Sequence, residues 1–267
     1  MKKIIAIILA LTLVLSLAAC GGKTDDKTIK VGATPAPHAE ILEIIKESLA
    51  ADGWTLESVE FDDYVLPNTA LSEGQLDANY FQHITYMNNF NEEYGINMVS
   101  AAGIHYEPFG LYAGKTASID ALADGAQIAV PNDATNEARA LLLLQQVGLI
   151  TLAEGVGINA TKSDIVANPK NIEIVEMKAE LLTTTLQDVD MAVINGNYAI
   201  GAGLKVAEAL AVEAADGAAA DAYQNGITVM AGHENDAKTQ ALVKALKSDA
   251  VKAFIEKTYE GAVVPLF

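Results

Sequence analysis

Short apolar runs alternate with longer segments of helical periodicity from Lys27 to the end of the chain. The short runs are bounded by turn residues and predict strands at 28–33, 55–61, 126–132, 171–177 and 190–196. The longer segments repeat apolar residues at helical spacing, several with a glycine at the expected end, and predict helices. These helices lie at 38–53, 84–95, 135–148 and 236–249. Alternation of this kind predicts an α/β protein with largely parallel sheets.

Two further strand-like segments bear on the number of lobes. Residues 104–115 contain Pro108 and Gly110, which suit a chain that leaves one sheet and enters another better than they suit a central strand. Residues 225–232 would bring the chain back. Two such crossings would place a cleft between two α/β lobes. The alternative is that both segments are edge strands of a single domain, and the pattern alone leaves both possibilities open.

The N-terminus has the pattern of a bacterial secretory signal. Two lysines precede an apolar run at 4–15 that is too short to span a bilayer, and the sequence LAAC ends at Cys20. LAAC is a lipobox, so we expect residues 1–19 to be removed as a signal peptide. Residues 20–27 are then a lipidated cysteine, carrying palmitate, and a flexible tether. This predicts a protein anchored to the cell membrane on its extracytoplasmic face.

Composition excludes several classes of protein. Cys20 is the only cysteine, so the folded body holds neither a disulfide nor a thiolate nucleophile. The formal net charge of −18 argues against nucleic acid as a partner, since phosphate binding needs a basic face. The chain shows no serine–histidine–acid spacing, no glycine-rich dinucleotide loop and no phosphate loop. We therefore expect a binding protein without a cofactor, not an enzyme.

The segment PNDATNEARALLLL, residues 131–144, contains the only arginine in the chain. A strand that ends at Asn132 and a helix that starts near Thr135 favour an anion at the first helical turn. Arg139 shares the inward face of this helix with Asn136, so its guanidinium needs an anionic partner. That partner is either an internal carboxylate or the carboxylate of a ligand. A ligand carboxylate suits the planar, bidentate guanidinium best. A phosphate fits poorly because the loop has no glycine.

Two other stretches carry polar or aromatic groups at strand ends. Aromatic side chains crowd into 61–68 and 78–87 although aromatic residues make up only 6% of the chain. Such rings are ordinarily core, but beside a cleft they would form an apolar slot that suits a thioether. In AVINGNYA, 192–199, a buried strand runs into Asn195 and Asn197. Asparagine there is either a turn former or an amide that binds the charged ends of a zwitterion.

Four long stretches closely resemble the methionine-binding lipoproteins of ABC importers, the NlpA family: VGATPAPHAEIL, FDDYVLPNTALSEGQLDANYFQH, AVPNDATNEARALLLLQQVGLI and DMAVINGNYAIGAGL. The resemblance covers nearly the whole mature chain. It implies a periplasmic-binding-protein-like fold of type II, in which two crossover strands join two α/β lobes. Lobe 1 would comprise 28–108 with 228–267, and lobe 2 would comprise 109–227. It also implies a monomer that captures L-methionine and delivers it to an ABC permease.

The same resemblance assigns roles to eight residues. Arg139 and Asn136 would hold the α-carboxylate of the ligand. Asn195 and Asn225 would hold its amino end and help to close the lobes. The slot for the ligand side chain would be lined by Tyr64, Phe81, His83 and Tyr86, with His83 near the sulfur.

Other binding functions compete with methionine capture. The ligand could be another amino acid or a methionine-containing dipeptide, and the sequence does not rank these. A metal-binding lipoprotein is a weaker alternative. Histidines do lie near carboxylates in sequence, at His38 with Glu40, His105 with Glu107 and His233 with Glu234. Scattered pairs do not make a site, so we expect no bound metal. A scaffold that only keeps the fold would show no stabilisation by ligand.

Overall fold

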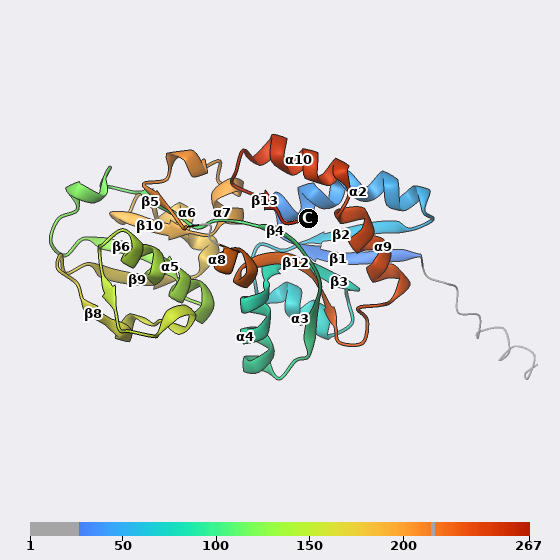
Figure 1. Cartoon of the computed structure of the whole chain (residues 1–267), viewed down its shortest axis with the longest axis horizontal. Coiled ribbons are helices and arrows are strands. Elements are labelled where there is room, and N and C mark those ends of the chain that lie inside the picture. Colours follow the sequence, from blue (N-terminus) through green and yellow to red (C-terminus); the bar gives the residue numbers. More distant parts are fainter. Residues whose placement is uncertain (1–26, 215–216) are drawn as a thin grey trace, which may run out of the picture.

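The computed structural model describes residues 27–214 and 217–267. The expected signal peptide, the lipidated Cys20 and the tether as far as residue 26 lie outside these residues. Two α/β units lie side by side along the long axis, each built on its own sheet (Figure 1). This is the two-lobed alternative predicted from the sequence, not the single domain. In the described part of the chain, no helix is long and apolar enough to cross a membrane.

The sheet of the first lobe has six strands in the order β13-β4-β12-β3-β1-β2. They are β1 (Thr28–Ala33), β2 (Thr55–Glu60), β3 (Ala78–His83), β4 (Met98–Tyr106), β12 (Gln224–Met230) and β13 (Val264–Pro265). Strand β1 pairs in parallel with β2 and β3, whereas β12 pairs antiparallel with β3 and β4. The sheet is therefore mixed, because the returning strand β12 enters it from the other lobe.

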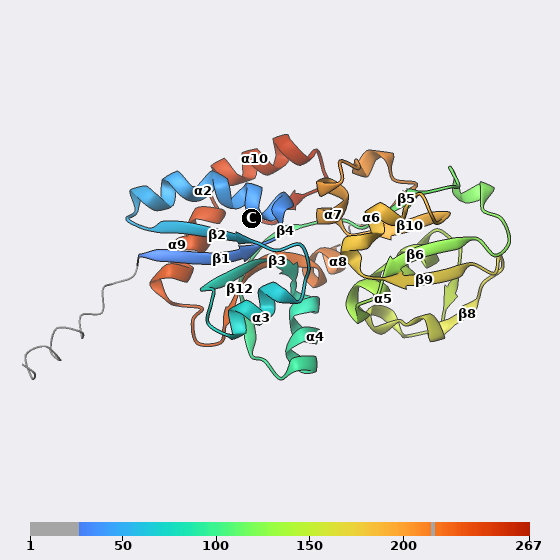
Figure 2. The same ribbon diagram turned by 180° about the vertical axis from the view of Figure 1, so that it is seen from behind.

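Helices cover both faces of this sheet, as both ribbon views show (Figures 1 and 2). One face carries α2 (Glu40–Ala51), α9 (Ala237–Leu246) and α10 (Asp249–Tyr259). Helix α2 follows a π-helical segment η2 (Pro35–Ala39), and α9 and α10 lie between β12 and β13. The other face carries α3 (Leu66–Ser72) and α4 (Ile84–Tyr94). Successive residues of β3 point to opposite faces, so Tyr80 packs in the first core and Phe81 in the second.

The sheet of the second lobe has five strands in the order β11-β5-β10-β6-β9. They are β5 (Gly110–Ala113), β6 (Gln127–Pro131), β9 (Glu173–Met177), β10 (Met191–Ile194) and β11 (Ala211–Val212). Helix α5 (Ala134–Gln146) packs on one face and α6 (Leu182–Thr185) on the other. Strand β6 is covered from both sides, which agrees with its unbroken apolar run.

Shorter elements complete the second lobe. They are the hairpin β7 (Thr151–Leu152) and β8 (Ile165–Ala167), the helices α7 (Gly196–Gly201) and α8 (Gly217–Ala222), and the 3-10 turns η3 (Ile119–Ala121), η4 (Gly157–Asn159), η5 (Lys162–Asp164), η6 (Ala179–Leu181) and η7 (Val206–Glu208). Helix α7 begins directly after β10, which places its first residues at the edge of the sheet that faces the other lobe.

The chain passes between the two sheets twice. It leaves the first sheet at the end of β4 and enters the second at β5, with Glu107, Pro108 and Phe109 between them. It returns after α8 into β12, which lies wholly in the first sheet. The residue boundaries expected for the lobes, 108/109 and 227/228, stay predictions.

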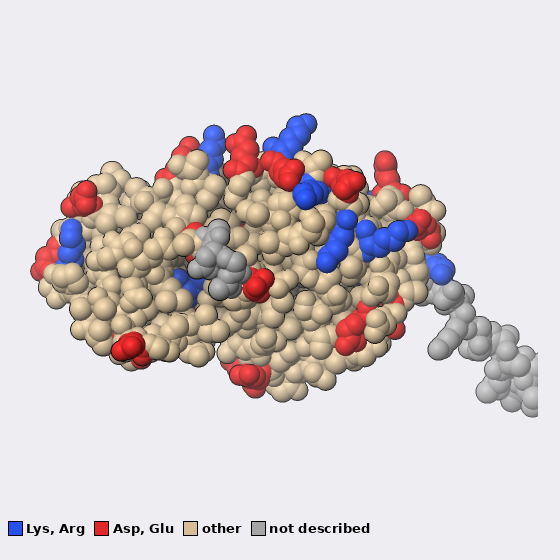
Figure 3. Space-filling view, viewed as in Figure 1, with Lys and Arg blue, Asp and Glu red and all other residues tan. Residues whose placement is uncertain are grey.

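Charged side chains of both signs are mixed on the surface. On the face shown in Figure 3, lysines lie among carboxylates around α2, α9 and α10. Exposed pairs such as Lys244 Nζ and Asp52 Oδ2, 3.1 Å apart, each contribute less than about 1 kcal/mol to stability. The apolar cores on both faces of each sheet therefore account for the fold, and the surface charge bears on solubility.

Candidate ligand-binding site

One pocket lies where the two lobes meet, and it collects side chains from both of them. Its empty space, counted together with the adjoining open solvent, is about 330 Å³. Its wall is formed by Tyr64, Phe81, Gln82, His83, Tyr86, Glu107, Phe109, Asn136, Arg139, Asn195, Gly196, Asn197 and Asn225. All eight residues predicted to contact a ligand are among them. Their convergence is a finding of the structure, while their roles in binding stay predictions.

The ends of strands and the starts of helices position these side chains. Phe81 and His83 lie on β3, and Tyr86 lies in the first turn of α4. His83 caps α4, because its Nδ1 accepts the backbone N–H of Tyr86 at 3.0 Å. On the other lobe Asp133 caps α5 by accepting the N–H of Asn136 at 3.0 Å. Both helices thus point their N-termini at the pocket.

The aromatic residues form one continuous group. The ring of Tyr64 lies 5.9 Å from Phe81, 5.7 Å from Tyr86 and 5.1 Å from Tyr198, measured between centroids. Burial raises the pKa of Tyr64 and of Tyr86, so both hydroxyls stay protonated and act as donors. Tyr80, which the sequence places beside them, faces the opposite side of the sheet. This arrangement is an apolar slot with polar rims.

Asn136 joins three polar groups at the centre of the pocket. Its Oδ1 accepts hydrogen bonds from Asn195 Nδ2 at 3.1 Å and from His83 Nε2 at 3.2 Å. Its Nδ2 donates to both carboxylate oxygens of Asp133 at 2.9 Å. Burial, with the charge of Arg139, lowers the pKa of His83 to about 3, so this ring is neutral. A neutral ring with its proton on Nε2 satisfies both of its contacts at once.

Arg139 is buried in the pocket wall, with 2% of its surface exposed, and it already has an acidic partner. Its Nε donates to Glu213 Oε1 at 2.8 Å, and its Nη2 donates to Glu213 Oε2 at 2.6 Å and to the Glu107 carbonyl at 2.7 Å. The guanidinium also stacks on Phe109 and Tyr223, with its carbon 4.0 and 4.3 Å from the ring centroids. The internal carboxylate left open by the sequence is therefore present.

Three of the hydrogen bonds that join the lobes connect the two walls around the pocket. The Tyr64 hydroxyl donates to Asn197 Oδ1 at 2.5 Å, and the Tyr198 hydroxyl donates to the Asp62 carbonyl at 2.8 Å. The contact between His83 and Asn136 is the third. Direct bonds of this kind between the two walls mean that the lobes are closed on each other.

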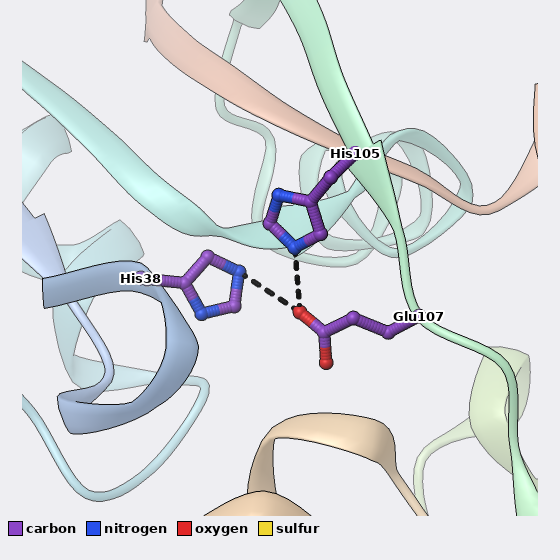
Figure 4. A group of neighbouring side chains, drawn as sticks. All are labelled: His38, His105 and Glu107. Atoms are coloured by element: carbon purple, nitrogen blue, oxygen red, sulfur yellow. Dashed lines mark hydrogen bonds and ion pairs between the residues drawn. The ribbon is translucent and has the colours of Figure 1, made fainter. Parts of the chain in front are cut away.

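Sequence reasoning missed a buried cluster that borders the pocket. His38, His105 and Glu107 meet there, although they were treated as parts of scattered pairs (Figure 4). Glu107 Oε1 lies 2.7 Å from His105 Nε2 and 3.3 Å from His38 Nε2. His233 lies elsewhere, in an exposed contact with Asp236. The spacing of His105 and Glu107 could have shown that both side chains share one side of an extended chain, but nothing local indicated His38.

The protein resembles one family over almost all of its length. The NlpA lipoprotein model matches residues 29–267. The methionine-binding lipoprotein MetQ of Bacillus subtilis is 39% identical over 275 residues, covering 100% of this chain and 99% of MetQ. A nutrient-binding protein from Burkholderia cenocepacia, solved bound to methionine, is 42% identical, with a TM-score of 0.85 over 90% of this chain and 100% of that one. A lipoprotein from Ruminococcus gnavus is 55% identical, with a TM-score of 0.89 over 90% and 100%. These likenesses confirm the predicted fold class.

Proposed function

The chain belongs to the NlpA lipoprotein family, and from this premise we propose that it captures L-methionine between its lobes and delivers it to the permease of an ABC importer. Relatives of similar length are methionine-binding lipoproteins, and a solved relative holds methionine. The observation that carries the proposal is the convergence of eight residues, chosen from the sequence alone, on a single pocket whose walls come from both lobes.

The pocket offers different chemistry at its two ends. The ligand thioether would lie among Tyr64, Phe81 and Tyr86, because sulfur makes favourable contacts with ring edges. The ligand carboxylate would lie against Arg139 and Asn136. The bonds from Arg139 to Glu213 and Glu107 use Nε and Nη2, so we assign Nη1 to the ligand. Glu213 and Phe109 hold the guanidinium plane in one orientation, which a ligand carboxylate can then use.

Capture would shift the protein towards the closed form. A ligand that contacts both walls binds the closed arrangement better than the open one, so it raises the closed population. Hydrogen bonds between the lobes add to this preference, each by about 1 kcal/mol. The closed form would be the one that docks on the permease, and the lobes would divide at 108/109 and 227/228.

The remaining proposals concern place and assembly. Cys20 would carry the lipid, including palmitate, that anchors the protein to the extracytoplasmic face of the cell membrane. The segment up to residue 27 would keep the binding lobes close to the permease. The protein would act as a monomer, because both walls of the pocket belong to one chain. Family membership points to binding and transport, not to catalysis.

A melting-temperature screen tests the proposed ligand. The purified protein is unfolded and refolded to remove any ligand it carries, then heated with each of the twenty amino acids, with D-methionine and with methionine-containing dipeptides. We expect L-methionine to give the largest shift, since a ligand at 100 times its Kd stabilises the folded state by about 2.7 kcal/mol. A larger shift with another amino acid or a dipeptide would replace methionine as the ligand. No shift with any of them would contradict the proposed function.

A further inference from the structure

The His38–His105–Glu107 cluster holds a carboxylate in the pocket wall that none of the contacts proposed above uses. Glu107 is only 4% exposed, and it lies between the end of β4 and the start of β5, where the chain crosses between lobes. Figure 4 shows both imidazole rings turned towards the same oxygen, Oε1, while Oε2 points away from them. The carboxylate therefore sits at the crossing with Oε1 towards the two rings and Oε2 turned away from them.

The second nitrogen of each histidine fixes the direction of these hydrogen bonds. His38 Nδ1 lies 2.7 Å from the Thr34 hydroxyl, and His105 Nδ1 lies 2.6 Å from the Tyr80 hydroxyl. With the proton of each ring on Nε2, each hydroxyl donates to Nδ1, His105 Nε2–H donates to Glu107 at 2.7 Å, and His38 Nε2–H donates to Asn225 Oδ1 at 3.3 Å. Burial lowers the pKa of His38 to about 4 and that of His105 to about 3, so both rings are neutral. His105 thus supplies a hydrogen bond to Glu107, His38 lies 3.3 Å from the same oxygen, and neither ring supplies a positive charge.

A third donor reaches the carboxylate from the opposite lobe. The backbone N–H of Asn197 hydrogen bonds to Glu107, and a Cβ on Gly196 would lie only 2.8 Å from Oε2. Glycine at position 196 is thus what allows the carboxylate to approach the start of α7. The donors His105 Nε2–H and Asn197 N–H favour the ionised form of Glu107, whereas burial opposes it.

Glu107 shares its nearby cation with another carboxylate. Charge on His38 and on Arg139 would lower the pKa of Glu107, but the His38 ring is neutral above its own pKa of about 4, and the Arg139 guanidinium is paired with Glu213 at 2.6 Å. Two carboxylates against one guanidinium leave one negative charge in excess. Burial alone raises the pKa of Glu107, which shows that its surroundings disfavour the charge unless a cation joins it.

A second acceptor lines the same pocket. Among the described residues, Asn195 Oδ1 is a buried side-chain oxygen with no hydrogen-bond partner, although Asn195 Nδ2 is bonded to Asn136. Asn195 is 5% exposed, lines the pocket and immediately precedes Gly196. A carboxylate and an unpaired amide oxygen that line one pocket are the partners that a primary ammonium group needs.

A bound metal ion fits the cluster less well. Two ligand atoms on a tetrahedral zinc ion lie about 3.3 Å apart, given bonds of roughly 2.0–2.1 Å. His105 Nε2 and Glu107 Oε1 are closer than this, at 2.7 Å, which is a hydrogen-bond distance. Both nitrogens are accounted for as donors, so the cluster is complete without an ion.

We propose that Glu107 is the counter-ion for the ammonium group of the amino-acid ligand, that Asn195 Oδ1 accepts a second bond from that group, and that His38 and His105 position the carboxylate. The inference rests on the proposed function and adds to it. The resemblance assigns the amino end to Asn195 and Asn225 alone, whereas a full opposite charge makes the ammonium group a requirement for binding. The pocket would then select amino acids over the corresponding carboxylic acids.

Calorimetric titration of two ligands tests this on the refolded wild-type protein. The ligands are L-methionine and 4-(methylsulfanyl)butanoate, which is methionine without its amino group. Removing one partner of a buried charged pair weakens binding by about 30-fold or more, so we expect at least that ratio between the two ligands. Comparable affinities, within about threefold, would overturn the inference while leaving methionine capture intact. If no amino acid binds, the proposed function fails and this inference fails with it.

Variants separate the charge from the shape of the side chain. Glu107→Gln should lose about 30-fold or more in methionine affinity, and its preference over the deaminated analogue should fall to near one. Glu137→Gln, a carboxamide at another buried carboxylate outside the pocket, is the matched control and should keep both affinities. Retained binding in Glu107→Gln would mean that Glu107 acts as a neutral acid. If this variant does not fold, the ratio of the two ligand affinities on the wild-type protein still tests the counter-ion role of Glu107.

The positioning histidines need a readout that a purely structural role would not move. In His105→Gln, affinity for methionine should fall while affinity for the deaminated analogue stays the same, because only the ammonium contact is lost. An equal fall for both ligands would reduce His105 to a packing residue. The alternative is a zinc ion bound by the cluster, and metal analysis of the wild-type protein, with titration of zinc alone, tests it. Stoichiometric zinc that disappears in His105→Gln would overturn the counter-ion assignment.

Discussion

Arg139 and Glu213 form a two-point ion pair in the wall of the pocket, with Nε–Oε1 at 2.8 Å and Nη2–Oε2 at 2.6 Å. Burial opposes the charged guanidinium, but the charge and hydrogen bonds of Glu213 outweigh this and raise the pKa of Arg139. Arg139 therefore has an internal partner, and under the proposed function it would bind the ligand carboxylate as well. Lysine, which dominates the basic residues of the chain, could not make the bidentate contact with Glu213.

Arg139→Lys should keep the charge and lose most of the binding. One ammonium cannot reach both oxygens of Glu213 and a ligand carboxylate as well, so methionine affinity should fall by roughly 30-fold, about 2 kcal/mol. Calorimetry measures it, with Lys162→Arg at an exposed pair as the control. Wild-type affinity in Arg139→Lys would mean that the guanidinium serves Glu213 alone.

Glu213→Gln should destabilise the protein even without ligand. The substitution leaves a buried guanidinium unpaired, which costs about 3 kcal/mol of unfolding free energy, the lower end of the range because Glu213 is partly exposed. Glu176→Gln removes the exposed partner of Lys162 and should change stability by less than about 1 kcal/mol. Urea unfolding of both variants decides, and equal effects would refute a special role for the buried pair.

Tyr64→Phe should weaken ligand binding without disturbing the aromatic slot. The hydroxyl donates to Asn197 across the lobes at 2.5 Å, so its loss should disfavour closure by about 1 kcal/mol and raise the Kd about fivefold. Tyr94→Phe is the control, since that exposed ring only stacks on Phe90 at 4.3 Å. If both variants bind methionine equally well, the bond between the lobes does not contribute to closure.

Unfolding stability should fall as the pH drops below about 6.5. Burial lowers the pKa of His38 to about 4, and the pKa values of His83 and His105 to about 3, against 6.5 in the unfolded chain. Between these values the unfolded chain binds more protons, so each histidine removes up to about 1.4 kcal/mol per pH unit on acidification. Their contribution is complete above pH 6.5. Burial raises the pKa of Glu107 and of Asp133, which opposes part of the loss.

Urea unfolding between pH 7.5 and pH 5 measures this dependence. His83→Gln removes one titrating ring and should reduce the slope below pH 6.5 by up to about 1.4 kcal/mol per pH unit. An unchanged slope in the variant would show that His83 is not held neutral in the folded state.

Elements of regular period were predictable from the sequence, and their ends were less so. The helix predicted at 38–53 starts at Glu40 in the structure, because Pro37 holds Ala36 in an extended conformation. The helix predicted at 236–249 ends at Leu246, and Ser248 caps a further helix, Asp249–Tyr259, that was not predicted. Local residue chemistry explains both differences.

Some residues of the candidate site could be placed from the sequence, and others could not. Asn136 and Arg139 could be placed on one inward face because they lie one turn apart on α5. Glu213 lies 74 residues further along the chain, in an alanine-rich stretch with no pattern that links it to α5. His38 likewise meets Glu107 only through the arrangement of η2 beside β4. Contacts between residues this far apart in the sequence depend on the tertiary fold, so no local sequence pattern predicts them.

Cocrystallisation with L-selenomethionine tests the central claim most directly, since anomalous scattering locates the selenium atom without any assumption about the pose. We predict one ligand selenium among Tyr64, Phe81 and Tyr86, about 5 Å from the ring centres, with the ligand carboxylate against Arg139. A pocket without selenium in crystals grown at saturating ligand, or selenium bound only outside these rings, would contradict capture of methionine between the lobes.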